Sequence, residues 1–333
     1  MLGKYADAFC FGPGATLVVA ALLFALDRLG GVAAACGATL TTSLVILFVG
    51  PHYAATYRRA YGSREIVAAH PWVTIAAPIV LAVAAWQAVR HPTSFGILFF
   101  ALYVAWSGYH YSGQSLGLAM LYPLRQGARL APREKRLLAL PLYLSWPLSI
   151  VGLLRTSMPA RSAAHELTRR AYPGPELPAW VAPVGLGLLA LSFWAVAVVA
   201  RERRRRGMPL PWPTYAVLSA QVLWFSVGLY NPLFSITLAP VFHSLQYLGL
   251  TSWHACRGGG APVRRFATYA GTVVLLGLLV NPIAALLLAH GRSGSEALVV
   301  SAALTTFINL HHFSLDGRIW RMRERQVATA LSS

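Results

Sequence analysis

Six of the ten histidines lie in four polar islands within otherwise apolar stretches of the chain. The islands are GPHYAATY (His52), WSGYHYSGQSLG (His110), FHSLQYLGLTSWH (His243 and His254) and NLHHFSLDG (His311 and His312). Ionisable side chains inside apolar segments tend to face a bundle interior and mark functional sites, and neutral imidazole suits zinc, copper and iron. The islands therefore predict a metal centre held by His52, His110, His243 and the His311–His312 pair, of which either member can face inward.

Polar residues accompany these histidines at helical spacing, since residues three or four apart share a helix face. Gln114 follows His110 by four residues, Gln246 and Tyr247 follow His243 by three and four, and Asn309 precedes His312 by three. A metal-bound imidazole commonly donates its second N–H to a carboxylate or carbonyl. Asp316, four residues after His312, is expected to orient a histidine in this way, and Gln114, Gln246 and Asn309 are expected to support the ligands.

The choice of metal rests on which ligand types the islands lack. They contain no cysteine and one carboxylate, Asp316, so a mononuclear, mostly histidine site is favoured over a Glu-rich di-iron centre. Fe(II) with open positions for O2 is the preferred ion, with zinc and copper as alternatives. Two further alternatives remain open: haem held by two histidines, and a hydrogen-bonded polar core in a non-enzymatic transporter or assembly factor.

The elements that must position the histidines are membrane helices. Hydrophobic residues make up 56% of the 333 and charged residues 11%, against about 25% charged in soluble domains. The net charge of +18 does not indicate nucleic-acid binding, because the arginines lie between long apolar runs. We therefore expect an all-α, polytopic membrane bundle forming one domain over residues 1–333, with the lipid bilayer as its partner.

A membrane helix needs roughly 20 apolar residues, and ten ranges satisfy this. They are 11–27, 32–54, 71–89, 94–115, 137–154, 178–200, 210–229, 232–254, 267–289 and 294–314. The first range is expected to be a retained span and not a signal peptide, because no convincing small-residue cleavage site follows it.

Charge bias predicts the orientation of these spans. With ten spans, 21 of the 28 lysines and arginines fall on one side, which the positive-inside rule makes cytoplasmic together with both termini. The expected cytoplasmic segments are basic loops near 55–66, 123–136, 201–207 and 257–265 and a tail over 317–333. The second, fourth, eighth and tenth spans then run from outside to inside and place the four histidine islands at similar depth.

The order GPHY, YHYSGQ, VFHSLQY, NLHHFSLD resembles that of the bacterial Brp/Blh β-carotene 15,15′-dioxygenase family. Pro51-His52, His110-Tyr111, Phe242-His243-Ser244 and the His311-to-Asp316 spacing are the matching features. Two departures stand out, because Tyr247 occupies the position of a second family histidine and no aspartate follows His52 in the first motif.

The resemblance implies an oxygenase of the bacterial inner membrane, with histidine-ligated iron that uses O2 to act on a hydrophobic lipid or isoprenoid. It also implies that tyrosines line the site, namely Tyr53, Tyr109, Tyr111 and Tyr247. Tyr111, Tyr247 and Asp316 are the candidate catalytic residues.

Overall fold

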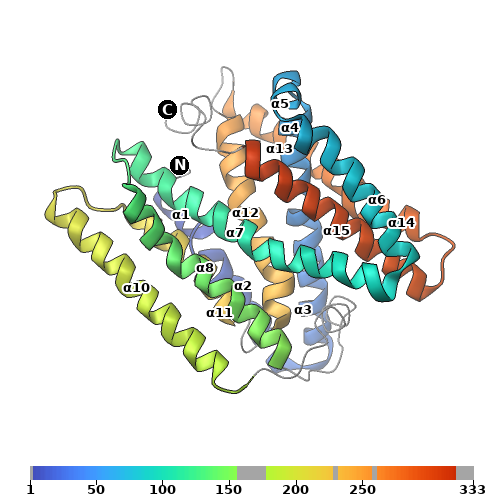
Figure 1. Ribbon diagram of the computed structural model, residues 1–333, viewed down its shortest axis with the longest axis horizontal. Coiled ribbons are helices and arrows are strands. Elements are labelled where there is room, and N and C mark those ends of the chain that lie inside the picture. The colour runs from blue at the N-terminus through green and yellow to red at the C-terminus, as the bar shows by residue number, and fades with distance from the viewer. Residues whose placement is uncertain (1–2, 156–177, 228–231, 257–260, 320–333) are drawn as a thin grey trace.

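Every regular element in the described part of the chain is a helix. The computed structural model describes residues 3–155, 178–227, 232–256 and 261–319 (Figure 1). The α-helices are α1 (Lys4–Cys10), α2 (Gly14–Leu29), α3 (Gly31–Leu44), α4 (Gly50–Tyr61), α5 (Arg64–Ala69), α6 (Ala77–Arg90), α7 (Ile97–Arg125), α8 (Pro132–Arg155), α10 (Val181–Arg205), α11 (Trp212–Val227), α12 (Pro232–Ala255), α13 (Pro262–Leu278), α14 (Ala284–Ala289) and α15 (Gly294–Ile319). π-helical turns lie at Val45–Val49, Trp72–Ala76, Pro92–Gly96 and Leu279–Ile283.

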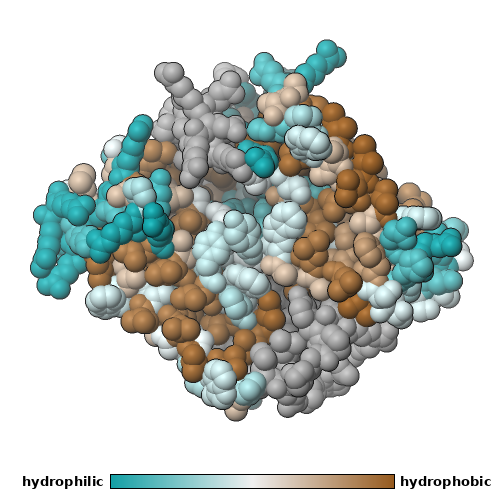
Figure 2. Space-filling view, viewed as in Figure 1, coloured by the Kyte–Doolittle hydropathy of each residue, from teal (hydrophilic) through white to brown (hydrophobic). Residues whose placement is uncertain are grey.

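Four helical segments are long and apolar enough to cross a membrane: Trp72–Arg90, Val181–Arg205, Pro262–Ala289 and Gly294–Ile319. Most residues in the apolar windows of the first three segments are not buried. Figure 2 shows apolar side chains across the body of the molecule, with hydrophilic ones gathered at its edges. The chain is therefore an all-helical membrane protein. Each predicted range contains helix, but the count of ten spans and the orientation of the termini stay predictions.

The basic segments differ from the expected loops. Residues 55–61 belong to α4, α7 continues to Arg125, and α10 continues to Arg205. Arginine is a good helix former, so these helices extend beyond their apolar stretches. Residues 257–260 and 320–333 of the expected loop and tail lie outside the described residues.

Helix α15 is the most enclosed of the four apolar segments. In its most apolar window 56% of the residues are buried, against 11% for Trp72–Arg90 and for Pro262–Ala289. It packs against α4, α6 and α7, and Figure 1 shows α7 crossing the middle of the molecule between α8 and α15. Buried polar residues of α15 such as Asn309, His311 and His312 thus face other helices and not lipid.

Helix α4 begins at a close backbone crossing with α13. A Cβ added to Gly50 would lie 2.8 Å from the carbonyl oxygen of Gly277, and one added to Gly277 would lie 2.3 Å from the nitrogen of Pro51. Small residues permit such approaches between membrane helices. The π-helical turn Val45–Val49 immediately precedes this point, and it adjusts the backbone ahead of Pro51, whose ring would clash with a regular helix.

A buried ion pair fastens α8 to α10. Arg203 donates to both carboxylate oxygens of Glu134 at 2.9 and 2.8 Å and to the carbonyl of Arg129 at 2.6 Å. The two side chains are 4% and 5% exposed. The Arg203 guanidinium holds the pKa of the Glu134 carboxyl below its usual value.

Replacing Glu134 by glutamine should strongly destabilise the protein, because it leaves the Arg203 charge buried without its partner, at a cost of about 3–5 kcal/mol. Thermal unfolding in detergent at neutral pH measures this. The control is Arg133→Gln, which removes an exposed pair with Glu202 and should change little. Because the folded-state pKa of Glu134 is lowered, the wild type should lose this contribution as the pH falls below about 4.3. Equal unfolding temperatures for the two variants would contradict the assignment.

Candidate metal centre

Four histidines from four helices meet at one point. His52 on α4, His110 on α7, His243 on α12 and His312 on α15 each offer a ring nitrogen, and these four atoms lie within 4.8 Å of one another. All four residues are buried, with 1%, 9%, 1% and 0% of their surface exposed. The cluster that the sequence predicts is therefore present, with one histidine from each island.

Two of the contacts between ring nitrogens have the spacing of metal ligands. His110 Nε2 lies 3.1 Å from His243 Nε2 and 3.2 Å from His312 Nε2. Two nitrogens bound to one ion at about 2.1 Å are about 3.0–3.4 Å apart. The His52 ring completes the group, with its centroid 4.3 Å from that of His312 and 4.9 Å from that of His243.

Hydrogen bonding alone satisfies this cluster poorly. Each ring nitrogen has one in-plane position, for a proton or a lone pair, so His110 Nε2 cannot bond well to two other ring nitrogens. Within the described residues, both ring nitrogens of His52 and the Nδ1 atoms of His243 and His312 have no hydrogen-bond partner. Buried polar atoms are normally paired. A cation bound by one lone pair from each ring removes the crowding of nitrogens around His110 and gives one nitrogen of His52 a partner. The residues therefore fit a metal ion.

His311 does not join the cluster. Its Nε2 contacts the Tyr61 hydroxyl at 3.0 Å and the Val73 carbonyl at 3.3 Å, and its ring stacks on Tyr57. Adjacent residues on a helix point about 100° apart, so one member of the pair must face away. His312 is the member that faces the other histidines, and His254 also lies outside the cluster.

Asp316 approaches His312 at the ring nitrogen that faces the cluster, not at the opposite one. Its Oδ2 lies 3.5 Å from His312 Nε2, whereas the expected orienting contact would lie at Nδ1, which has no partner in the described structure. Oδ1 accepts hydrogen bonds from Thr56 at 2.9 Å and from the Tyr247 hydroxyl at 3.2 Å. The carboxylate therefore shares the centre with the histidines and does not stand behind one of them.

The three expected supporting side chains act mainly on the backbone. Gln114 donates to the His243 carbonyl at 3.0 Å, and Gln246 donates to the Phe11 carbonyl at 2.9 Å. Asn309 accepts from Tyr53 at 2.8 Å. No hydrogen bond from these amides to a histidine ring is present among the described residues.

The aromatic neighbours were predicted in part. The Tyr111 ring lies 4.3 Å from the His243 ring, and the Tyr247 ring lies 4.4 Å from the His52 ring. Tyr109, although 59% exposed, lines the cavity that adjoins the centre. Sequence reasoning missed Phe313, which stacks on His110 at 4.4 Å, and Thr56. The signal for Thr56 was available, because it follows His52 by four residues on the same helix.

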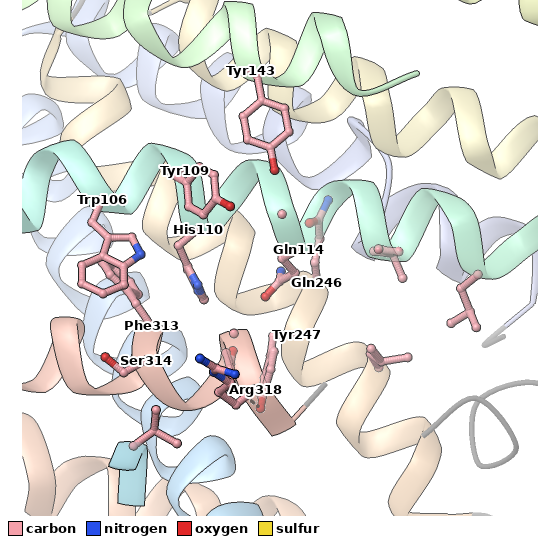
Figure 3. Close-up of a pocket in the computed structure, with 18 residues that line it drawn as sticks. Trp106, Tyr109, His110, Gln114, Tyr143, Gln246, Tyr247, Phe313, Ser314 and Arg318 are labelled. Atoms are coloured by element: carbon pink, nitrogen blue, oxygen red, sulfur yellow. Dashed lines mark hydrogen bonds between the residues drawn. The ribbon is translucent and has the colours of Figure 1, made fainter. Parts of the chain in front are cut away.

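A cavity of about 530 Å³ adjoins the centre. Figure 3 shows His110 on α7 beside this cavity, with Trp106 and Phe313 to one side of it and Tyr143 approaching from α8. Asp316 also lines the cavity. Its wall combines aromatic and aliphatic side chains with polar ones, namely His110, Gln114, Gln246, Ser314, Asp316 and Arg318. His110 and Asp316 connect the cavity to the histidine cluster.

Comparison of the chain with protein-family models, with curated proteins and with solved structures finds no match. The resemblance of the four histidine islands to a known family therefore stays an expectation from the sequence.

Proposed function

We propose that the protein is an integral-membrane, metal-dependent oxygenase in which His52, His110, His243 and His312 hold Fe(II). The observation that carries the proposal is the convergence of four buried ring nitrogens within 4.8 Å, next to an aromatic-walled cavity. Iron, when bound, supplies O2 activation. Zinc and copper also accept imidazole ligands. The choice of iron therefore rests on the O2-dependent oxygenase reaction that the sequence predicts.

The packing of the rings argues against haem. Two histidines that bind a haem iron from opposite faces have Nε2 atoms about 4 Å apart, with the porphyrin plane between them. The Nε2 contacts of His110 with His243 and His312 are 3.1 and 3.2 Å. The four rings touch one another and leave no plane for a porphyrin, so the cluster favours a bare ion.

The cavity supports a hydrophobic, elongated substrate that enters from the bilayer, of the lipid or isoprenoid class. The aromatic walls hold a planar apolar chain, and burial of the centre excludes water. For oxidative cleavage of an alkene, one C=C bond and one O2 molecule yield two C=O groups. Both oxygen atoms end in the products, so no further reductant is required.

Iron content provides the direct test of the metal. The full chain, purified in detergent under anaerobic conditions and supplied with Fe(II), should retain about one equivalent per chain in elemental analysis. If the protein retains zinc or copper in preference to iron, the bound metal is that ion and not Fe(II). Metal content well below one equivalent, after reconstitution with each ion, would overturn the proposal in favour of a polar, non-enzymatic core.

Substitution of Gly117 tests the cavity. A side chain there meets nothing within 4 Å in the described structure, so Gly117→Leu should project into the cavity without disturbing helix packing. With β-carotene in mixed micelles as the probe, oxygen uptake should fall about 100-fold while iron content stays unchanged. Gly187→Leu on α10, also free of neighbours within 4 Å, is the matched control. Equal uptake by both variants would exclude the cavity as the substrate site.

A further inference from the structure

We infer that Asp316 is a fifth ligand of the metal centre, a carboxylate bound beside the four histidines. This inference rests on the proposed metal function and adds to it the identity and charge of one more donor. Three properties of Asp316 support it: the distance of Oδ2 from the cluster, the hydrogen bonds that hold Oδ1, and the negative charge of the carboxylate.

The spacing of Asp316 matches that of the ring nitrogens. Its Oδ2 lies 3.5 Å from His312 Nε2, close to the 3.1 and 3.2 Å between the Nε2 atoms of the cluster. Donors that share one ion at about 2.1 Å are separated by about 3.0–3.4 Å. A movement of a few tenths of an ångström therefore brings Oδ2 into the same coordination sphere as His312.

The rest of the carboxylate is held so that Oδ2 faces the centre. Oδ1 accepts hydrogen bonds from Thr56 on α4 and from Tyr247 on α12, and the two hydroxyls are themselves 2.8 Å apart. Hydrogen-bonded second-sphere partners of this kind commonly fix metal-binding carboxylates. These two hydroxyls fix the orientation of Asp316 from the two helices that supply His52 and His243.

Charge gives the third argument. The Asp316 side chain is 7% exposed, and a buried carboxylate is costly unless it is paired or binds a metal. Four neutral imidazoles around a divalent ion leave two positive charges buried, and one carboxylate reduces this to one. Because Asp316 also lines the cavity, the anionic ligand lies on the side of the ion that faces the substrate. Carboxylate favours harder ions such as Mn²⁺ and Fe²⁺ over Cu⁺.

Cobalt provides the test, since Co²⁺ binds imidazole and carboxylate and its visible absorption reports coordination number. The full chain in detergent is titrated with Co²⁺ alone, and Asp316→Asn is compared with the wild type. Asparagine keeps the size and the Oδ1 acceptor but loses the charge. We expect Co²⁺ affinity to fall by more than about 100-fold, beyond the effect of removing a second-sphere group. The absorption should become more intense, as expected for four-coordinate Co²⁺. Asp7→Asn, which removes a buried carboxylate on α1, should behave as the wild type.

A second variant keeps the test decisive if Asp316→Asn folds poorly. Asp316→Ala opens space for a small carboxylate, so added formate should restore the wild-type Co²⁺ spectrum, which a purely structural role would not allow. If Asp316→Asn binds Co²⁺ with the affinity and the spectrum of the wild type, this inference is overturned. The four-histidine site is then unaffected. If the wild type binds neither Co²⁺ nor Fe²⁺, the proposed function fails, and the fifth ligand fails with it.

Discussion

His312→Ala will lose bound metal, whereas His311→Ala, one residue earlier, will retain it. The reason is geometric, because His312 Nε2 points into the cluster while His311 is bonded to Tyr61 and Val73. Loss of a direct ligand should weaken Fe(II) or Co²⁺ binding by more than about 100-fold, beyond the effect of removing a second-sphere group. His110→Ala and His243→Ala should behave as His312→Ala.

His311→Ala is a stringent control because it also removes a buried imidazole from α15. Loss of its hydrogen bonds should lower the free energy of unfolding by about 0.5–1.5 kcal/mol without changing metal content. Elemental analysis and thermal unfolding in detergent, measured on the same preparations, separate the two effects. Equal metal content in the two alanine variants would show that the cluster does not bind the ion.

Gly277→Ala is the second substitution expected to have a large effect, although it lies outside the metal centre. The added methyl would lie 2.3 Å from the Pro51 nitrogen and 2.5 Å from the Gly50 carbonyl carbon. Both are backbone atoms, so α4 must move away from α13. His52 is the next residue along, and functional side chains tolerate displacements of only about 0.5 Å. We therefore expect reduced metal affinity and a loss of about 1–3 kcal/mol in stability.

The matched control for this substitution is Gly271→Ala on the same helix, where an added methyl meets nothing within 4 Å in the described structure. It should preserve metal content and should not destabilise the protein, because alanine is the better helix former. Co²⁺ titration and thermal unfolding report on both variants. Wild-type affinity in Gly277→Ala would show that the crossing of α4 with α13 does not position His52.

The histidine cluster could be predicted because each of its histidines lies in a short polar segment, and four such segments occur along the chain. Apolar runs predicted the helices, and charge bias predicted a common direction for four of them. The inner half or inner end of each of these four predicted spans contains a histidine. What the sequence did not determine is the rotation of each helix about its axis. That rotation places His312 inward and His311 outward, and it directs Gln246 toward Phe11 instead of toward a ligand.

The position of Asp316 was also only partly predictable from the sequence. Its i+4 spacing from His312 correctly placed the two side chains together, but the spacing could not show which ring nitrogen the carboxylate approaches. Thr56 and Tyr247, which hold its other oxygen, come from α4 and α12. Contacts between helices distant in the chain depend on tertiary packing, and one sequence carries little information on them.

The separation of the ligands along the chain has a consequence for biosynthesis. Thr56 and its partner Asp316 are 260 residues apart, and His312 lies on the last helix that the structure describes. When α4 is synthesised, the other three histidines of the cluster do not yet exist, because α7, α12 and finally α15 follow it along the chain. The proposed ion can therefore meet all four histidines only after α15 has been made, and binding it would join α4 to α15 late in folding.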